Sequence, residues 1–249
     1  MKKTLLPLFA LALAFTVVSC EKEKAEETPV TPPATAPANP TPATPSDAAG
    51  VLVGIKTVTT VATFPGFPAS EIELGTAVAV FPNQAASGFL DAGTVTCNEK
   101  TLSKQSNNSY VYTPSATDIE GIDFGGASWK VAGNGNVPAI DRTFSPFPSN
   151  PEFTAPATIS TGSAYTVTLD RTTGADSTIV AFHSGNKSLI KTYRGNITSF
   201  QFTAEEMATI TKGDGYLQVT PYNFTFQTIS GKKIYFFNEA VVTKSVKYN

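Results

Sequence analysis

The side chains that most often perform catalysis are scarce in this sequence. His183 is the only histidine and lies at the end of the apolar run TIVAFHS, while Cys97 is the only cysteine besides Cys20. A Ser-His-Asp or Cys-His site needs that histidine, yet no Gly-x-Ser-x-Gly elbow accompanies it. One histidine and one free cysteine also fall short of the usual ligand set of a zinc or haem site. We expect His183 to be structural or solvent-facing and Cys97 to be a small buried residue.

Acidic residues suggest a second kind of chemistry, which is calcium binding. Asp118, Glu120 and Asp123 lie close together around a glycine in the segment TDIEGID. Calcium takes six to eight oxygen ligands from flexible loops, and this cluster supplies part of such a set. A solvated acidic turn is the alternative interpretation, so these three residues form a weak calcium candidate.

A glycosidase needs two facing carboxylates about 5–9 Å apart in a cleft. Glu205 and Glu206 are adjacent in the sequence and would point apart on a helix. No other pair of carboxylates stands out. The sequence therefore predicts a protein that is not an enzyme and that carries no cofactor.

Aromatic residues are the remaining candidates, and they favour binding over catalysis. Tyr222, Phe224 and Phe226 alternate within segment 215–229, so the period of two of a β-strand places them on one face. We expect this face to point inward, into a core; facing outward, the three residues would instead form an aromatic strip for a sugar or a protein. Trp129, the single tryptophan, is expected in the core, with ligand binding as the alternative.

Short β-type runs separated by Gly, Pro and Asn must position these side chains. They recur from residue 51 to residue 248 and are rich in Val, Thr, Ile and aromatic residues. This density of strands is typical of β-sandwiches. We expect an all-β fold of two tandem Ig-like β-sandwich modules, 51–147 and 151–249, with the boundary in a proline-rich stretch.

Two local signals interrupt the strand pattern. Thr203 and Glu206 have the spacing of a helix capping box, which predicts one short helix over 204–211 that ends near Gly213. The run Gly-Asn-Gly-Asn at 133–136 tolerates positive φ and predicts a hairpin turn.

The first residues of the chain predict where the protein is located in the cell. Lys2 and Lys3 precede an apolar run of about 14 residues, which is shorter than the roughly 20 needed to span a bilayer. The run ends in Val-Val-Ser-Cys, which resembles the lipobox of bacterial lipoprotein precursors. The resemblance implies a signal peptide over 1–19 and acyl chains on Cys20, and more than one chain makes a stable membrane anchor.

Residues 20–50 read as a linker rather than a fold. The acidic run EKEKAEE follows Cys20 and resembles the export signals of surface-displayed lipoproteins, with a solvated spacer as the alternative. Seven prolines follow between residues 29 and 45, and such a segment forms a semi-rigid polyproline II spacer. We expect a lipid-anchored outer-membrane protein, exposed on the cell surface or on the periplasmic face.

Charge narrows the possible partners. Without Lys2 and Lys3 of the leader, 16 Lys and Arg stand against 20 Asp and Glu, a net charge of about −4. Because phosphate neutralisation needs a basic surface, nucleic acid is not an expected partner.

The segment GGASWKVAGNGNVPAI, at 125–140, resembles an element of uncharacterised bacterial β-sandwich lipoproteins, and TVTCNEKTL resembles the hairpin before it. That resemblance implies a β-sandwich and no known activity.

Three functional hypotheses remain open. The first is a non-enzymatic binding or adhesion protein with an unknown protein or glycan ligand. The second is a structural or assembly subunit of an envelope complex that pairs strands with a partner, for which segment 232–248 is the candidate edge strand. The third is an accessory protein that captures carbohydrate on an outward aromatic platform.

Overall fold

The computed structural model describes residues 45–61 and 70–249. The predicted signal peptide, Cys20 and the linker up to residue 44 lie outside the described residues and stay predictions. The described residues all belong to one compact unit. In this described part, none of the helical structure is long and apolar enough to cross a membrane.

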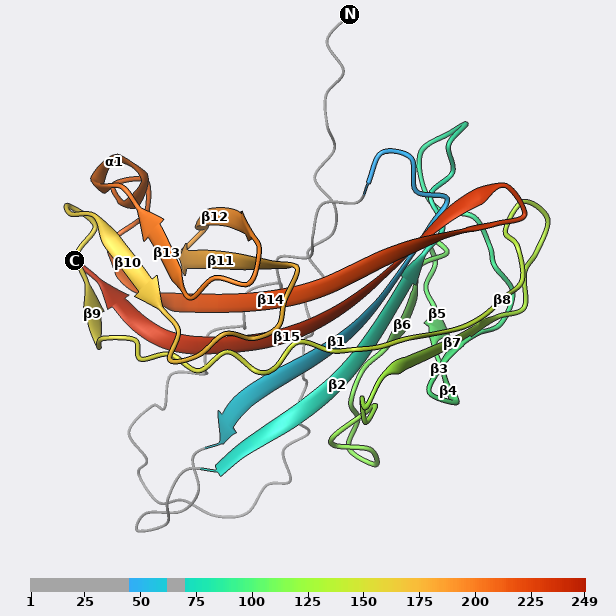
Figure 1. The fold of residues 1–249 in the computed structure, drawn as a ribbon, viewed down its shortest axis with the longest axis horizontal. Coiled ribbons are helices and arrows are strands. Elements are labelled where there is room, and N and C mark those ends of the chain that lie inside the picture. Colours follow the sequence, from blue (N-terminus) through green and yellow to red (C-terminus); the bar gives the residue numbers. More distant parts are fainter. Residues whose placement is uncertain (1–44, 62–69) are drawn as a thin grey trace, which may run out of the picture. The chain divides into compact units, whose positions relative to one another are not determined.

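The described chain is all-β with one short helix, which confirms the predicted fold class (Figure 1). The path of the largest sheet is β12 (Lys187–Arg194), β11 (Ser177–Ser184), β14 (Gly213–Ile229), β15 (Lys232–Tyr248), β1 (Gly50–Val61), β2 (Ser70–Val80), β6 (Tyr110–Tyr112) and β5 (Ser103–Lys104). Its ninth strand, β9 (Thr158–Ile159), pairs with β15. A second sheet joins β4 (Lys100–Thr101), β3 (Val95–Cys97), β7 (Ala127–Val131) and β8 (Ile140–Phe144). A third pairs β10 (Tyr165–Thr168) with β13 (Ser199–Phe202), which α1 (Ala204–Met207) follows.

The hairpin of β14 and β15 runs the length of the large sheet (Figure 1). Each strand has 17 residues, and the pairing extends from Gly213 opposite Tyr248 to Ile229 opposite Lys232. Ser230 and Gly231 close the hairpin with φ values of 50° and 76°. Two consecutive positive φ values are those of a type I′ turn, whose twist matches that of the flanking strands.

The prediction that segment 232–248 is an edge strand is wrong. β15 pairs with β14 on one side and, in parallel, with β1 on the other. Parallel pairing of distant segments leaves no local sequence signal, because the partners are joined through the whole intervening chain. Within the described residues, the path of the large sheet ends instead at β12 and β5.

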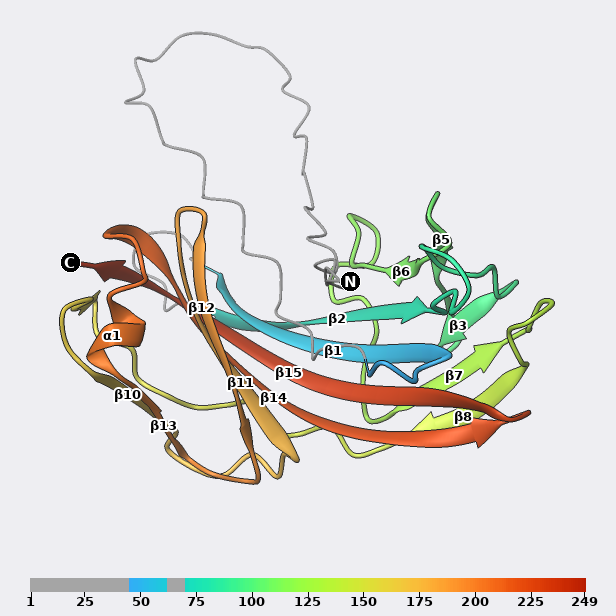
Figure 2. The ribbon, with the colours of Figure 1, turned by 90° about the horizontal axis from the view of Figure 1, so that it is seen from above.

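One face of the large sheet carries two hydrophobic cores. In the first, side chains of β3, β7 and β8 pack on Leu52 and Phe236. In the second, side chains of β10, β13 and α1 pack on Val219 and Tyr248. Figure 2 shows the small sheets at opposite ends of the long hairpin. We call this face the covered face.

The division into modules 51–147 and 151–249 is not confirmed, because the large sheet combines strands from both ranges. Ile234 and Phe236 of the second range belong to the first core. Between the cores, the connecting segment crosses the covered face, and the carbonyl of Pro146 accepts hydrogen bonds from Asn223 and Asn238 at 3.3 Å each. The two cores therefore share one hairpin.

The predicted helix forms, but it is shorter than expected. Both bonds of the capping box are present: Thr203 Oγ1 accepts from the Glu206 amide at 3.2 Å, and the Glu206 carboxylate accepts from the Thr203 amide at 2.9 Å. Met207 and Ile210 are buried as the spacing predicts. The helix ends at Met207 rather than near Gly213, because the amides of Thr209 and Ile210 bond three residues back instead of four.

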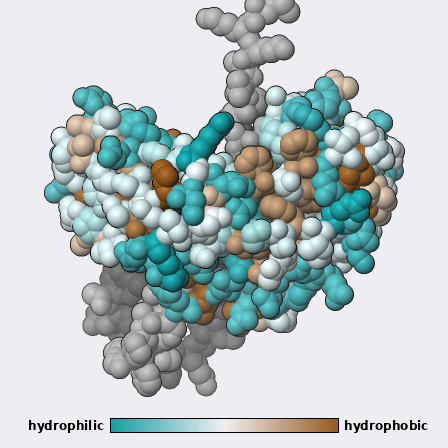
Figure 3. Space-filling view, in the orientation of Figure 1, coloured by the Kyte–Doolittle hydropathy of each residue, from teal (hydrophilic) through white to brown (hydrophobic). Residues whose placement is uncertain are grey.

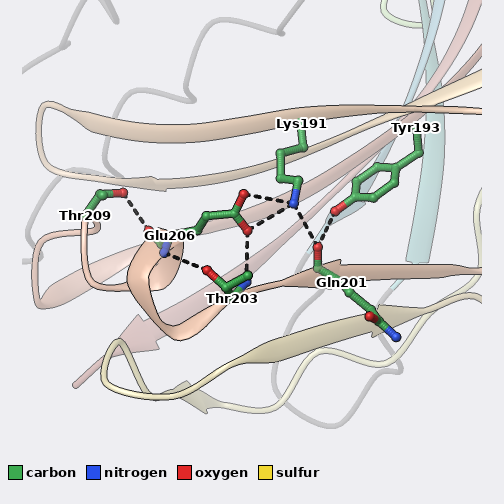
Figure 4. Close-up of polar contacts among 6 residues, drawn as sticks. All are labelled: Lys191, Tyr193, Gln201, Thr203, Glu206 and Thr209. Carbon is green, nitrogen blue, oxygen red and sulfur yellow. Dashed lines mark hydrogen bonds and ion pairs between the residues drawn. The ribbon is translucent and has the colours of Figure 1, made fainter.

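A lysine of the edge strand β12 fixes this helix to the large sheet (Figure 4). Lys191 Nζ lies 2.9 Å from a carboxylate oxygen of Glu206 and donates to the carbonyl of Gln201 at 3.1 Å. Tyr193 donates to the same carbonyl. The hydrogen bond with Glu206 raises the pKa of Lys191, so this contact links α1 and β13 to β12 as a charged pair.

The predicted turn at 133–136 connects β7 and β8. Gly133 and Gly135 have φ values of 81° and 55°, and Asn134 bridges to Val137. The two strands pair as an antiparallel hairpin, from Val131 opposite Ile140 outward.

Candidate functional site

Trp129 does not contribute a binding surface. Its side chain is 1% exposed and belongs to the first core, opposite Cys97 on the neighbouring strand. It was one of the possible ligand-binding residues, and the structure assigns it to packing. The strand β7 alternates buried and exposed positions, and Trp129 occupies a buried one.

The three calcium candidates are not assembled into a metal site. The Asp118 carboxylate accepts from Lys100 Nζ at 2.8 Å and from the Tyr112 hydroxyl. The hydrogen bond with Lys100 lowers the pKa of Asp118, so this carboxylate already has a cationic partner. Across residues 45–61 and 70–249, no three His, Cys, Asp or Glu side chains are grouped to hold a metal ion, Glu120 and Asp123 included.

His183 lies against a serine, a contact that the sequence did not predict. Its Nδ1 lies 2.7 Å from Ser188 Oγ, across the β11–β12 pair. The Nε2 atom is buried and has no hydrogen-bond partner among the described residues. Burial lowers the pKa of His183, which favours the neutral imidazole. A catalytic triad needs a carboxylate to orient the histidine, and here the second ring nitrogen has no such partner in the described chain.

The predicted alternation of Tyr222, Phe224 and Phe226 is confirmed, since the three side chains share the face opposite the covered face. Tyr235 and Phe237 of β15 lie beside them and complete what we call the aromatic strip. The rings of Phe224 and Phe237 stack at a centroid distance of 5.7 Å, and Phe226 lies 5.4 Å from Tyr235. The strip therefore consists of rings in mutual contact along two paired strands.

The aromatic strip is exposed at two of its five rings, Phe224 and Phe226 of β14. Phe224 and Phe226 are 43% and 49% exposed, while Tyr222, Tyr235 and Phe237 are buried. The cause is the length of β11, whose pairing with β14 ends at Ser177 opposite Tyr222. Beyond that point no strand of the described chain flanks β14 on this side. In the space-filling view, hydrophobic colours gather over the long hairpin (Figure 3).

One end of the aromatic strip holds the segment that leads into β1. Tyr235 donates its hydroxyl hydrogen to Asp47 Oδ1 at 2.9 Å, and Lys233 pairs with the same carboxylate. The Lys233 ammonium also lies 5.2 Å from the centre of the Phe226 ring, within the range of a cation–π contact. The hydrogen bond with Lys233 lowers the pKa of Asp47.

A buried carboxyl group lies at the other end of the aromatic strip. Glu239 is fully buried, and it is directly opposite Tyr222 on β14 and Ile55 on β1. Neither carboxyl oxygen has a hydrogen-bond partner in the described residues. Loss of hydration on burial raises the pKa of Glu239 to about 8, so the group is largely protonated at neutral pH.

Sequence reasoning missed Glu239 because segment 232–248 was interpreted as an edge strand, where a glutamate needs no explanation. The signal was nevertheless present, since Asn238 and Glu239 interrupt the apolar run IYFFNEAVV. Once this strand is known to be central, two adjacent polar residues stand out at its middle.

Comparison with known proteins adds no further constraint: no protein-family model matches the chain, and no curated protein matches it.

Proposed function

We propose that this chain is a lipid-anchored bacterial outer-membrane protein with a non-enzymatic binding or adhesion role, and that the aromatic strip is its contact surface. The lipobox at Cys20 supports the anchor, and the proline-rich linker would hold the folded unit away from the membrane. The single observation that carries the binding role is the exposure of Phe224 and Phe226 on a hairpin shared by two cores.

The physical case for binding is the apolar area that these two rings leave in water. A phenylalanine side chain buries on the order of 150–250 Å² when fully covered. Covering the exposed parts of Phe224 and Phe226 would contribute roughly 2 kcal/mol each, at about 25 cal/mol per Å². Because the Phe224 ring stacks on Phe237 and the Phe226 ring contacts Tyr235, little side-chain entropy is lost when a ligand covers them.

The strip accommodates a protein or a glycan ligand, and the test must distinguish these. The mature acylated chain on vesicles would be screened against a glycan array and against a panel of host extracellular-matrix proteins. For any ligand found, Phe224→Ala/Phe226→Ala should weaken binding at least tenfold. Ile119→Ala, at a position 65% exposed outside the strip, is the matched control and should change little. A ligand that binds the double variant as tightly as the parent would remove the strip from the proposal.

Location is tested separately, by protease treatment of intact producing cells. Loss of residues 51–249 while a periplasmic control protein survives would place the domain on the cell surface. Survival of the domain until the outer membrane is opened would contradict adhesion and indicate a role inside the envelope.

An assembly subunit that pairs strands with a partner is the alternative, and two free edges favour it. β12 ends the path of the large sheet, with Ile190 49% exposed, and none of the described strands flanks β14 beyond Tyr222 on the β11 side. Both edges present backbone groups that a partner strand could pair with. Sedimentation of the mature chain discriminates the two functions, because self-association at micromolar concentration favours assembly and a monomer favours ligand binding.

A further inference from the structure

We propose that residues 40–45 of the linker, Pro-Thr-Pro-Ala-Thr-Pro, dock on the aromatic strip as an extended polyproline II segment. The inference rests on the proposed function, since it concerns the same surface and names what occupies it before an external ligand arrives. The occupant is a segment of this chain, which joins the described residues at Pro45.

The chain enters the folded unit beside the aromatic strip. The Ala48 amide donates to the Pro45 carbonyl at 3.0 Å, which closes a turn directly beside the aromatic strip. Asp47 in this turn is held by the Tyr235 hydroxyl and the Lys233 ammonium. Ala48 is fully buried and packs in the same hydrophobic cluster as Tyr222 and Phe237. The linker therefore reaches the folded unit on the face that carries the strip.

The aromatic strip and the linker segment 40–45 have similar lengths. From Tyr235 to the row of Glu239 the strip extends four residues along β15, or about 13 Å at roughly 3.3 Å per residue. A polyproline II segment rises about 3.1 Å per residue, so the five steps from Pro40 to Pro45 cover about 15 Å. Three residues per turn place Pro42 and Pro45 on one side of such a segment. The turn at 45–48 reverses the chain, so a segment of this length can run back along the strip.

The proline-rich segment and the aromatic strip are chemically complementary. Polyproline II segments have no internal hydrogen bonds, and they bind aromatic-lined grooves with little loss of entropy because they are already extended. Phe224 and Phe226 supply exposed rings for the prolines.

Docking would couple the linker to ligand binding. An external ligand must displace residues 40–45, so its apparent affinity falls by the fraction of molecules in which the strip is free. Weakening the docked segment should therefore tighten binding of any ligand that uses the strip.

Backbone NMR relaxation of the mature acylated chain in lipid nanodiscs tests the docking. In the parent, the heteronuclear NOE of Thr41, Ala43 and Thr44 should match that of the sheet and exceed that of Thr28. In Phe224→Ala/Phe226→Ala the three values should fall to the level of Thr28. Ile119→Ala is the control and should leave them high. Equal values at Thr28 and at the three residues in the parent would overturn the proposal.

A second pair of variants keeps the proposal testable if the strip variant unfolds. Pro40→Ser/Pro42→Ser should lower the NOE of Thr41, Ala43 and Thr44, while Pro29→Ser/Pro32→Ser, with the same loss of two prolines, should not. Unchanged values in the first variant would also overturn docking. The outcomes separate from those of the proposed function: an undocked linker with ligand binding that still depends on Phe224 and Phe226 sinks only the docking. A docked linker with ligand binding that ignores the strip sinks only the binding role.

Discussion

Asn223 and Asn238 face each other across the β14–β15 pair, and both side-chain amides donate to the carbonyl of Pro146. Asn238 also donates to the carbonyl of Phe144 at 3.0 Å. This pair holds the segment that connects the two cores against the covered face.

Asn238→Ala should destabilise the folded state. It removes the hydrogen bonds that Asn238 donates to the carbonyls of Phe144 and Pro146, and each such bond contributes about 0.5–1.5 kcal/mol net. Chemical denaturation followed by circular dichroism measures the loss. Asn150→Ala is a suitable control, because its 3.3 Å contact with Glu73 lies outside the Asn pair. The parent should unfold in one transition because both cores use the same hairpin, and two separate transitions would contradict that coupling.

The stability of the domain should fall as pH rises from about 4.5 to about 8. Glu239 retains its proton in the folded state, where burial raises its pKa to about 8, while in the unfolded chain the pKa returns to the ordinary value of 4.5. Within this window the unfolded state binds fewer protons, so unfolding becomes more favourable by up to about 1.4 kcal/mol per pH unit. Below 4.5 both states are protonated and the effect vanishes.

Glu239→Gln should remove that pH dependence and stabilise the protein at pH 8, because the amide cannot ionise. Denaturation midpoints of parent and variant, measured at pH 5 and pH 8, give the comparison. Glu205→Gln is the control, since hydrogen bonds lower its pKa and its ionisation does not oppose folding. A parent whose stability is level across the window would show that Glu239 is ionised or hydrated in the folded state.

Gly75→Ala should destabilise the fold by about 2–3 kcal/mol, the cost of forced overpacking. A Cβ at Gly75 would lie 1.7 Å from the carbonyl oxygen of Ile122, where the backbones of β2 and the 120–122 loop exchange hydrogen bonds. At Gly125 a Cβ would meet no heavy atom within 4 Å, so Gly125→Ala is the matched control and should stay within a few tenths. Equal midpoints for the two variants in urea would show that the loop moves aside without cost.

Cys97 should resist thiol reagents in the native protein. It is fully buried, and burial raises the pKa of its thiol to about 12, so almost no thiolate forms at pH 8. Labelling followed by mass spectrometry should show modification only when the domain unfolds, at a rate that rises with denaturant. Rapid labelling under native conditions would mean that the first core opens locally.

Local features of this protein follow from the sequence. The alternation of Tyr222, Phe224 and Phe226, the capping box of Thr203 and Glu206, and the glycine turn at 133–136 each depend on residues within a few positions of one another. Side-chain direction alternates along any strand, and a capping box needs only two suitable residues three positions apart. The all-β class follows in the same way, because it is the sum of many such local signals.

The tertiary structure decided which surfaces these elements present. Pairing of β1 with β15 joins residues about 180 positions apart, and it turns a segment that reads as an edge strand into the centre of the sheet. The same pairing buries Glu239 beside Ile55. Phe224 and Phe226 are exposed because β11 is too short to flank them, and Trp129 is buried by the packing of β7. Which face is covered depends on contacts between distant strands, and the residue pattern of one strand cannot specify its partners.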